Sequence, residues 1–281
     1  MRQVKLSLDK VILATGHTGT IGKHLPESIV KPNWNLLHPR SIRFPVSQNF
    51  DLIHLAGIVG ESNVANDIAL SIKLNIDATR DLGNKFFEFS TGRLIYISSS
   101  HVYGNVETLI SEEDACNPIS KYAEQKLRAE TELVNIFKTV PSRLLILRVF
   151  SILDWGMPPG TLGNKIENII HGSMSKIQNA ADIRDFLTPK TVAHVIYKIT
   201  KSYDCHGVIN VCSGTGMSVG KAVEKFFELS GKKLPPSILI EENSKTPSII
   251  GCNSKLLSLG DLELELSWKL FKQPNYSKNE N

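Results

Sequence analysis

An apolar run followed by regularly spaced glycines, near the start of this chain, limits its fold more than any other feature. Residues 11–15 have the composition of a buried strand, and Gly16, Gly19 and Gly22 follow with the spacing G-x-x-G-x-x-G. The pattern then predicts a first helix over residues 20–30. Glycines in such a turn let the backbone approach a dinucleotide pyrophosphate, and the next helix aims its N-terminus at the phosphates. The motif therefore predicts a dinucleotide-binding α/β unit.

Short strand-like runs alternate with helical stretches along the first two thirds of the chain. Strands are predicted at residues 51–55, 93–98, 144–150 and 208–211, with a weaker one at 35–37. Long helices are predicted at residues 74–89 and 120–137. This alternation is typical of a parallel sheet covered by helices on both faces. The predicted fold is therefore α/β, a Rossmann-type doubly wound parallel sheet.

The composition changes after residue 150, where Pro158, Pro159, Gly160 and Gly163 introduce short helices and loops. We expect residues 1–150 to form the dinucleotide-binding domain and residues 151–281 to form mainly a smaller substrate-binding region. The two are interleaved, because a strand near 207–212 returns to the sheet. The polar tail, residues 273–281, is expected to fray.

Composition excludes several classes of protein. The chain has 281 residues, a net charge of +4 and 41% hydrophobic residues, without a basic stripe interleaved with aromatics, so no nucleic-acid partner is expected. No histidine pattern has metal-ligand spacing, so no metal site is predicted. The cysteines are scattered without a C-x-x-C pair, which favours reduced thiols. They are Cys116, Cys205, Cys212 and Cys252.

Neither end nor middle of the sequence suggests a membrane or an export signal. A signal peptide at the polar N-terminus would remove the first strand, and no apolar run approaches the roughly 18 residues of a membrane span. We therefore expect a soluble, cytoplasmic protein with no membrane partner.

Tyr122 and Lys126 lie four residues apart on a predicted helix, so both side chains lie on one face. A free tyrosine has a pKa of about 10, and exchange near neutral pH requires it to fall by roughly 3 units. A neighbouring ammonium and a cationic nicotinamide ring both favour the phenolate. Upstream, the strand ending in Ser98, Ser99 and Ser100 brings a hydroxyl to the sheet edge where such folds bind ligands.

In this context the chain resembles the extended short-chain dehydrogenases/reductases of the nucleotide-sugar epimerase/dehydratase family. The motifs that carry the resemblance occur in order across nearly the whole chain. They are Thr15-Gly-x-x-Gly-x-x-Gly22, His54-Leu-Ala-Gly57, Asn75-x-x-Ala-Thr79, Ser98-Ser-Ser-x-Val-Tyr-Gly104, Tyr122-x-x-x-Lys126, Arg148-Val-Phe-Ser151, Arg184-Asp-Phe186 and Gly207-Val-Ile-Asn-Val211.

The resemblance implies a role for each matched residue. Tyr122 is the expected acid/base, Lys126 its partner and Ser99 the catalytic hydroxyl. Arg184 and Ser99 are expected to contact the substrate, with Ser151 where the family usually has an asparagine. The residues implied in cofactor binding are Thr15, Gly16, Gly19, Thr20, Ile21, Gly22, His38, Arg40, Leu55, Ala56, Gly57, Asn75, Tyr122, Lys126 and Phe150.

The second strand should end in an acidic residue if the cofactor ribose is unphosphorylated. No acidic residue lies between Glu27 and Asp51, and the same window holds His38 and Arg40. The sequence therefore favours NADP(H), with NAD(H) as the alternative. A shortened loop with Arg40 facing solvent would also fit.

The dehydratases of this family have an Asp-Glu pair after the catalytic hydroxyl, and the residues at these two positions indicate the expected reaction. Where those enzymes have Asp-Glu, this chain has Ser100 and His101, which argues against a dehydratase. A 4-keto sugar reductase using NADPH is favoured, and a nucleotide-sugar 4-epimerase with tightly bound NAD is the alternative. A non-catalytic dinucleotide-binding regulatory protein is a third. The resemblance also implies a homodimer through helices 74–89 and 120–137.

Overall fold

The computed structural model describes most of the chain. The described residues are 10–38, 41–45, 48–106, 109–174, 176–202, 204–235, 238–241, 248–260 and 262. The polar tail at residues 273–281 and Arg40 lie outside them. No helix in these ranges is long and apolar enough to cross a membrane.

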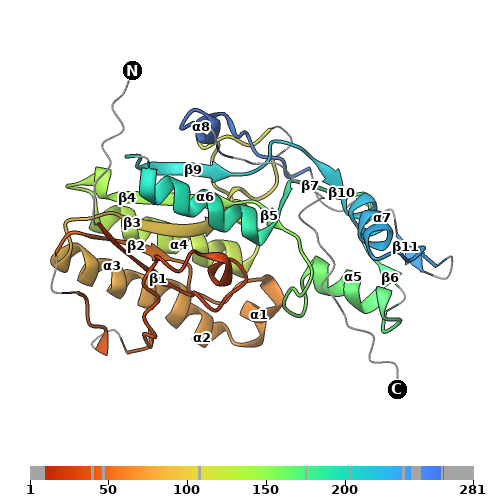
Figure 1. The fold of residues 1–281 in the computed structure, drawn as a ribbon, viewed down its shortest axis with the longest axis horizontal. Helices are drawn as coiled ribbons and strands as arrows, with labels where there is room; N and C mark the ends of the chain where they lie inside the picture. The colour runs from red at the N-terminus through yellow and green to blue at the C-terminus, as the bar shows by residue number, and fades with distance from the viewer. Residues whose placement is uncertain are drawn as a thin grey trace.

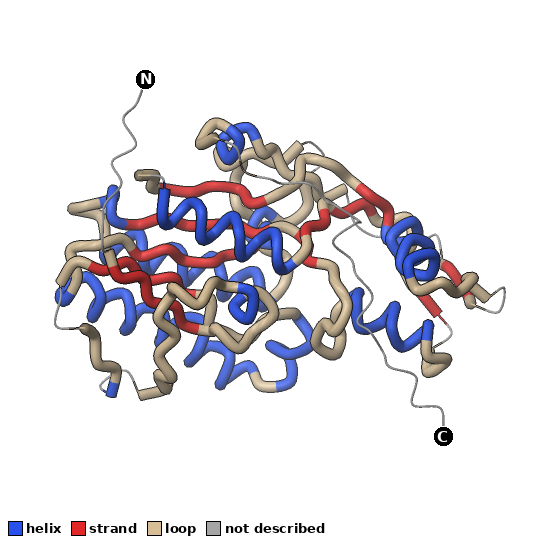
Figure 2. The backbone as a smooth tube through the Cα atoms, viewed as in Figure 1, coloured by secondary structure: helices blue, strands red, loops and turns tan. Residues whose placement is uncertain are grey.

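A parallel sheet forms the centre of the molecule (Figures 1 and 2). Within the described ranges its strands follow the order β1-β2-β3-β4-β9. They are β1 (Val11–Thr15), β2 (Phe50–His54), β3 (Leu94–Ser99), β4 (Leu144–Val149) and β9 (Gly207–Val211). All neighbouring pairs are parallel, so the carboxyl ends of the strands meet at one edge.

Helices cover both faces of this sheet, which confirms the doubly wound α/β prediction. On one face, α3 and α4 pack through Leu82, Phe86 and Leu133 against strand residues that include Leu52 and Ile146. On the other face, α6 packs against the opposite side of the same strands (Figure 1). The helices of the described chain are α1 (Glu61–Asn66), α2 (Ile68–Ile72), α3 (Ala78–Phe89), α4 (Lys121–Ile136), α5 (Leu162–Ile170), α6 (Pro189–Ser202), α7 (Val219–Leu229) and α8 (Ser254–Leu257).

A smaller lobe lies beside the carboxyl edge of the sheet and contains α5 and α7 (Figure 1). Its own apolar core includes Trp155, Ile166 and Phe226, with the Trp155 and Phe226 ring centroids 4.6 Å apart. Three short strand pairs complete it and join it to the sheet. They are β5 (Ser151–Ile152) with β8 (Phe186–Leu187), β6 (Lys176–Ile177) with β11 (Leu239–Ile240), and β7 (Ile183–Arg184) with β10 (Met217–Ser218).

The predicted first helix, residues 20–30, is wrong. A three-residue 3-10 helix, Gly22–His24, occupies its beginning, and turns follow it. Pro26 explains the difference, because a proline has no N–H and disfavours helical geometry in the residue before it. That residue, Leu25, is extended with φ −67° and ψ 140°.

The predicted weak strand at residues 35–37 is also absent from the described structure. The position beside β1, on the side away from β2, is instead taken by Val30 alone. The Val30 carbonyl accepts a hydrogen bond from the Ala14 N–H at 2.9 Å, and the Val30 N–H donates to the Ile12 carbonyl at 2.9 Å. The half of the sheet beyond β1 is therefore reduced to one bridging residue.

The other predicted elements are confirmed to within a residue or two at each end. The exception is the helix predicted at residues 74–89, which starts earlier than predicted. The helical segment begins at Ile68 and passes through a π-helical turn, Lys73–Asp77, before α3. Ser120 caps α4, because its side chain accepts a hydrogen bond from the Ala123 N–H at 3.2 Å.

Candidate active site

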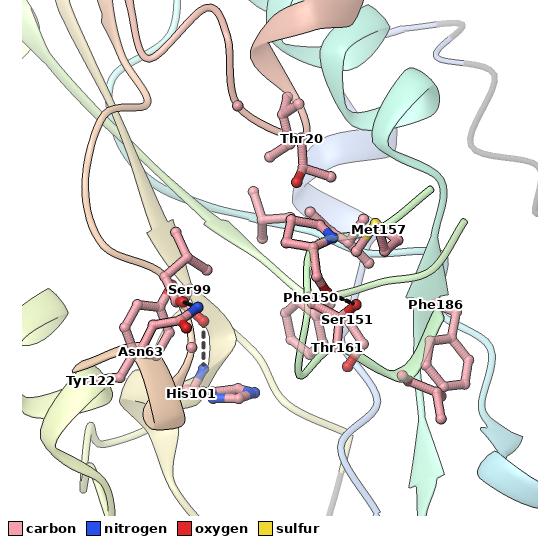
Figure 3. Close-up of a pocket in the computed structure, with 18 of the residues that line it drawn as sticks. Thr20, Asn63, Ser99, His101, Tyr122, Phe150, Ser151, Met157, Thr161 and Phe186 are labelled. Carbon is pink, nitrogen blue, oxygen red and sulfur yellow. Dashed lines mark hydrogen bonds between the residues drawn. The ribbon is translucent and has the colours of Figure 1, made fainter. Parts of the chain in front are cut away.

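A cavity of about 1140 Å³ opens at the carboxyl edge of the sheet, between the sheet and the smaller lobe. The loops that follow β1 and β2, the ends of β3 and β4, and residues from α4, α5 and β7 line it. Open α/β sheets bind their ligands at this edge. Figure 3 shows Ser99, Tyr122 and His101 together on one side of the cavity, with Thr20 and Ser151 on other parts of its wall.

The loop after β1 is closely folded and lines the cavity with backbone. Gly16 has φ +69°, a conformation that favours glycine, and its carbonyl accepts a hydrogen bond from the Gly19 N–H at 3.0 Å. A Cβ on Gly22 would lie 2.2 Å from the Gly16 oxygen. Only glycine therefore fits at both positions, and the turn exposes backbone where a phosphate group can approach.

A buried histidine joins this loop to the one after β2. The His54 ring lies 2.7 Å from the Thr15 hydroxyl through Nδ1 and 3.0 Å from the Thr79 hydroxyl through Nε2. Burial, with a smaller effect of the Lys126 charge, lowers the pKa of His54 to about 3. A neutral imidazole thus fixes the ends of β1 and β2.

Asn75 fixes the second loop from behind. Its side-chain oxygen accepts from the Ile58 N–H at 2.8 Å, and its amide nitrogen donates to the Ile58 carbonyl at 2.9 Å and to Gln125 at 2.8 Å. A Cβ on Gly57 would lie 2.7 Å from the Asn75 oxygen. Asn75 is buried and shapes the cavity wall without lining it.

Ser99 and Tyr122 meet on the opposite wall. Ser99 ends β3, Tyr122 lies in the first turn of α4, and their exposed fractions are 8% and 6%. Burial raises the pKa of Tyr122 to about 12, and a hydrogen bond with Ser99 opposes this shift more weakly. The protein's own groups therefore favour the protonated phenol; the fall expected from the sequence includes the charge of a bound nicotinamide and stays a prediction.

Lys126 lies one turn further along α4 and is 5% exposed. Its ammonium donates to the Ile97 carbonyl at 2.7 Å and to the Tyr96 hydroxyl at 3.2 Å, and lies 4.6 Å from the centre of the Tyr96 ring. Burial lowers the pKa of Lys126 to about 8, while Glu130 opposes this shift. Tyr96 is a contact that the motif alone does not predict.

A buried ion pair supports this wall from below. Glu130, two turns after Tyr122 on α4, accepts from Arg148 on β4 at 2.7 Å and from the Ser98 hydroxyl on β3. Since each partner lies on a different element, the pair fixes α4 against β3 and β4. Removing one partner of such a buried pair leaves an uncompensated charge, which is strongly destabilising.

The smaller lobe contributes Arg184 to the cavity. Its guanidinium donates to the Asp182 carboxylate at 2.8 Å and to the Ile183 carbonyl at 2.7 Å, and burial lowers its pKa. The next residue, Asp185, is fully buried and accepts from the Ser213 N–H at 2.8 Å and its hydroxyl at 2.6 Å. Asp185 therefore holds the strand that presents Arg184.

The structure brings most of the predicted site residues together around this one cavity. Those that line it are Gly16, Gly19, Thr20, Ile21, Gly22, Leu55, Ala56, Gly57, Ser99, Tyr122, Lys126, Phe150, Ser151 and Arg184. Thr15 and Asn75 lie directly behind it. His38 is exposed and does not line it, and Arg40 lies outside the described residues.

Several cavity residues were not predicted from the motifs. His101, which stands at a position of the dehydratase Asp-Glu pair, lines the cavity with its ring edge-on to Tyr122, with ring centroids 6.0 Å apart and an angle of 82° (Figure 3). Burial, with the Arg184 charge, lowers the His101 pKa. Asn63, Lys23 and Lys165 also line the cavity. Their positions depend on loop and lobe packing, which has no short-range sequence signal.

Comparison with known proteins places this geometry in context. Residues 12–212 match the model of the NAD dependent epimerase/dehydratase family. GDP-6-deoxy-D-talose 4-dehydrogenase from Aggregatibacter actinomycetemcomitans is 24% identical over 269 residues, which cover 88% of this chain and 90% of that protein.

Two solved structures share the fold. The structure of RMD from Pseudomonas aeruginosa complexed with NADPH superposes with a TM-score of 0.80 at 22% identity, covering 94% of this chain and 96% of that one. The UDP-glucuronic acid 4-epimerase from Bacillus cereus, in complex with UDP-glucuronic acid and NAD, gives 0.78 at 20% identity, covering 92% and 96%.

Proposed function

Because this chain belongs to the NAD dependent epimerase/dehydratase family, we propose that it reduces the 4-keto group of a nucleotide-activated sugar with NADPH. That the chain is an NAD(P)-dependent enzyme of the extended short-chain dehydrogenase/reductase type follows from the family itself. The reaction and its direction are our proposal, which rests on the arrangement of Ser99, Tyr122 and Lys126.

The cavity fits a nicotinamide dinucleotide. Its volume of about 1140 Å³ exceeds the range of about 300–1,000 Å³ typical for ligand pockets, as a site for two ligands requires. The backbone of Gly16, Gly19 and Gly22 would hold the pyrophosphate, and Lys126 and Tyr122 would face the nicotinamide ribose. When bound, the cofactor supplies hydride to the carbonyl carbon.

One arrangement carries the proposal: the Tyr122 phenol and the Ser99 hydroxyl lie together on the cavity wall (Figure 3). Without a bound cofactor, burial favours the protonated phenol, because it raises the pKa of Tyr122 to about 12. A protonated phenol is the donor that an alkoxide forming at the carbonyl oxygen needs, whereas oxidation of an alcohol needs the phenolate. In the proposed step Tyr122 gives its proton to that oxygen and Ser99 hydrogen-bonds it.

The substrate class is supported by the smaller lobe and by relatives. Arg184 presents a planar guanidinium to the cavity, a shape that suits diphosphate oxygens, although Asp182 already accepts one of its hydrogen bonds. Two of the similar proteins, GDP-6-deoxy-D-talose 4-dehydrogenase and UDP-glucuronic acid 4-epimerase, have a nucleotide sugar in their names. We propose that Ser151, which also lines the cavity and donates its N–H to the carbonyl of Asp185 next to Arg184 at 3.0 Å, contacts the substrate as well.

The preference for NADPH is supported by the position beside β1. Val30 occupies the place of a second strand, and the residue directly after it is Lys31, where an NAD-specific site has a carboxylate. Lys31 is half-buried, and its ammonium donates to the Leu25 carbonyl at 2.8 Å. A cation at this position attracts the anionic 2′-phosphate of NADPH, whereas a carboxylate would repel it.

A turnover assay tests the proposal. The purified protein is incubated with NADPH and nucleotide-linked 4-keto sugars carrying guanosine, uridine or thymidine, and the absorbance of reduced nicotinamide is followed. We expect consumption of NADPH, at least tenfold faster than of NADH, and a nucleotide-linked sugar alcohol as product. No turnover with any of these substrates, despite tight NADPH binding, would contradict the reductase assignment.

A 4-epimerase is the second candidate, favoured by the fold it shares with the epimerase from Bacillus cereus. An epimerase keeps its cofactor through the cycle, so its purified form would retain NAD. Denaturing the purified protein and identifying the released nucleotide separates the two. Stoichiometric NAD⁺ identifies the epimerase, whereas nucleotide-free protein that binds NADPH more tightly than NADH supports the reductase.

A further inference from the structure

The loop after β1 is followed by too little helix to stabilise a phosphate by its dipole. A full helix places about half a positive charge at its N-terminus, because many peptide dipoles align. The 3-10 helix after this loop spans only Gly22–His24, and Leu25 leaves helical geometry before Pro26. The positive charge that normally faces a bound pyrophosphate is therefore small in this chain.

Lys23 lies within this same 3-10 helix and lines the cavity. Its backbone N–H donates to the Gly19 carbonyl at 3.1 Å. The backbone of Lys23 therefore lies one turn after Gly19, the middle glycine of the motif. Its side chain is exposed. No carboxylate of the described residues lies within 4.0 Å of its ammonium.

The other cations of the cavity differ from Lys23. Lys126 donates to Ile97 and Tyr96, Lys176 forms an ion pair with Glu241 at 2.5 Å, and Arg184 forms one with Asp182. Lys165 has no such partner in the described chain, but it lies on α5 in the smaller lobe. Lys23 is thus the cation available on the wall formed by the glycine loop.

The groups around Lys23 leave its ammonium available to a ligand. The Asp154 carboxylate is close enough to influence it electrostatically, but it accepts a hydrogen bond from the Trp155 N–H at 2.8 Å, and burial raises its pKa. Burial and the Lys23 charge lower the pKa of His24, while Asp154 opposes this shift. Lys190, which also acts on His24, adds to the positive potential here.

We propose that the Lys23 ammonium binds the pyrophosphate of the dinucleotide and replaces the charge that a longer helix would supply. The inference rests on the proposed function, since it requires that the cavity takes a nicotinamide dinucleotide. An ammonium on a flexible stem offers three donors, and hydrogen bonds between charged partners are about twice as strong as neutral ones.

Binding measurements on Lys23→Gln test this inference without any need for turnover. Titration calorimetry with NADPH should show a dissociation constant raised about tenfold, the effect of one charge-assisted hydrogen bond of about 1.5 kcal/mol. ADP-ribose, which has the pyrophosphate but no nicotinamide, should lose affinity by the same factor. Lys23→Arg should retain most of the affinity, and the dependence on salt should be weaker in Lys23→Gln than in wild type.

Lys138→Gln serves as the matched control, because it removes the same charge from an exposed residue that does not line the cavity. If Lys23→Gln binds NADPH and ADP-ribose within twofold of wild type, the inference is wrong while the proposed function stands. If wild type binds neither NADPH nor NADH, the proposed function fails and the inference fails with it.

Discussion

The two walls of the cavity are built in opposite ways. The wall proposed for catalysis, called the catalytic wall below, is formed by Ser99, Tyr122 and Lys126. It rests on the regular elements β3 and α4, which a buried ion pair fixes from below. The loop wall, formed by residues 16–23, rests on a turn, a three-residue 3-10 helix and a single bridging residue beyond β1. One wall is positioned by layers of packed structure, and the other by backbone contacts within one loop.

This difference teaches where substitutions should act. On the catalytic wall, side-chain chemistry can change while the elements stay in place. On the loop wall, the backbone itself is proposed to bind the cofactor. A substitution that disturbs a close backbone contact, such as the one between Gly22 and Gly16, would therefore also disturb binding. We therefore expect loop substitutions to lower cofactor affinity and catalytic-wall substitutions to lower turnover.

Among the substitutions considered for cofactor binding, Gly22→Ala should cause the largest loss of NADPH affinity. The added Cβ would lie 2.2 Å from the Gly16 oxygen and 2.6 Å from His17 Cα, so backbone must move. A strain of about 3 kcal/mol corresponds to a loss of NADPH affinity on the order of 100-fold. Gly220→Ala is the control, because there the closest contact of the new Cβ is 3.3 Å, in α7. Affinity within threefold of wild type in Gly22→Ala would show that the turn adapts.

His54 should make the stability of the protein sensitive to acid. Its pKa is about 3 when folded, against an ordinary 6.5, so between these values the unfolded chain binds a proton that the folded protein does not. Stability is therefore lost as pH falls through this window, by about 2 kcal/mol at pH 5. Urea unfolding at pH 7 and pH 5 measures this loss.

His54→Gln should remove most of that pH dependence, whatever its effect on stability at pH 7. His171→Gln is the control, because His171 is exposed at the end of α5. An equal loss of stability between pH 7 and pH 5 in His54→Gln and wild type would place the acid sensitivity elsewhere.

Lys126 should set an alkaline limit on turnover. With a pKa of about 8, it is an ammonium below that pH and an amine above it. If the ammonium is required, the rate should fall about tenfold per pH unit above 8. Lys126→Arg, which stays charged, should move the limit upward if it folds, and Lys126→Met should give a slow, flat profile. A wild-type profile that is flat to pH 10 would exclude this role.

The sequence predicted the regular part of the molecule well. The central strands have clear apolar runs, and α4 has a long stretch with helical periodicity. The structure confirms the positions predicted for them. Ser99, Tyr122 and Lys126 come together because two such elements carry them. Their role in catalysis stays a prediction, as does the homodimer.

The loop wall could not be predicted in the same way. The helical pattern over residues 20–30 predicts a helix where Pro26 ends it early. The position beside β1 is filled by Val30, and no strand-like run in the sequence surrounds this residue. His38 was placed in the site only because a strand was expected before it. Lys23 and His101 reach the cavity from short 3-10 helices, whose direction depends on contacts distant in sequence.

Tyr122→Phe tests the central claim, that the two walls divide binding from chemistry, most directly. The variant keeps the ring and loses the proton that Tyr122 is proposed to donate. NADPH affinity by calorimetry should stay within threefold of wild type, while the single-turnover rate with a nucleotide-linked 4-keto sugar should fall on the order of 1,000-fold. Full turnover in Tyr122→Phe, or a loss of NADPH binding that accounts for the lost rate, would contradict the account.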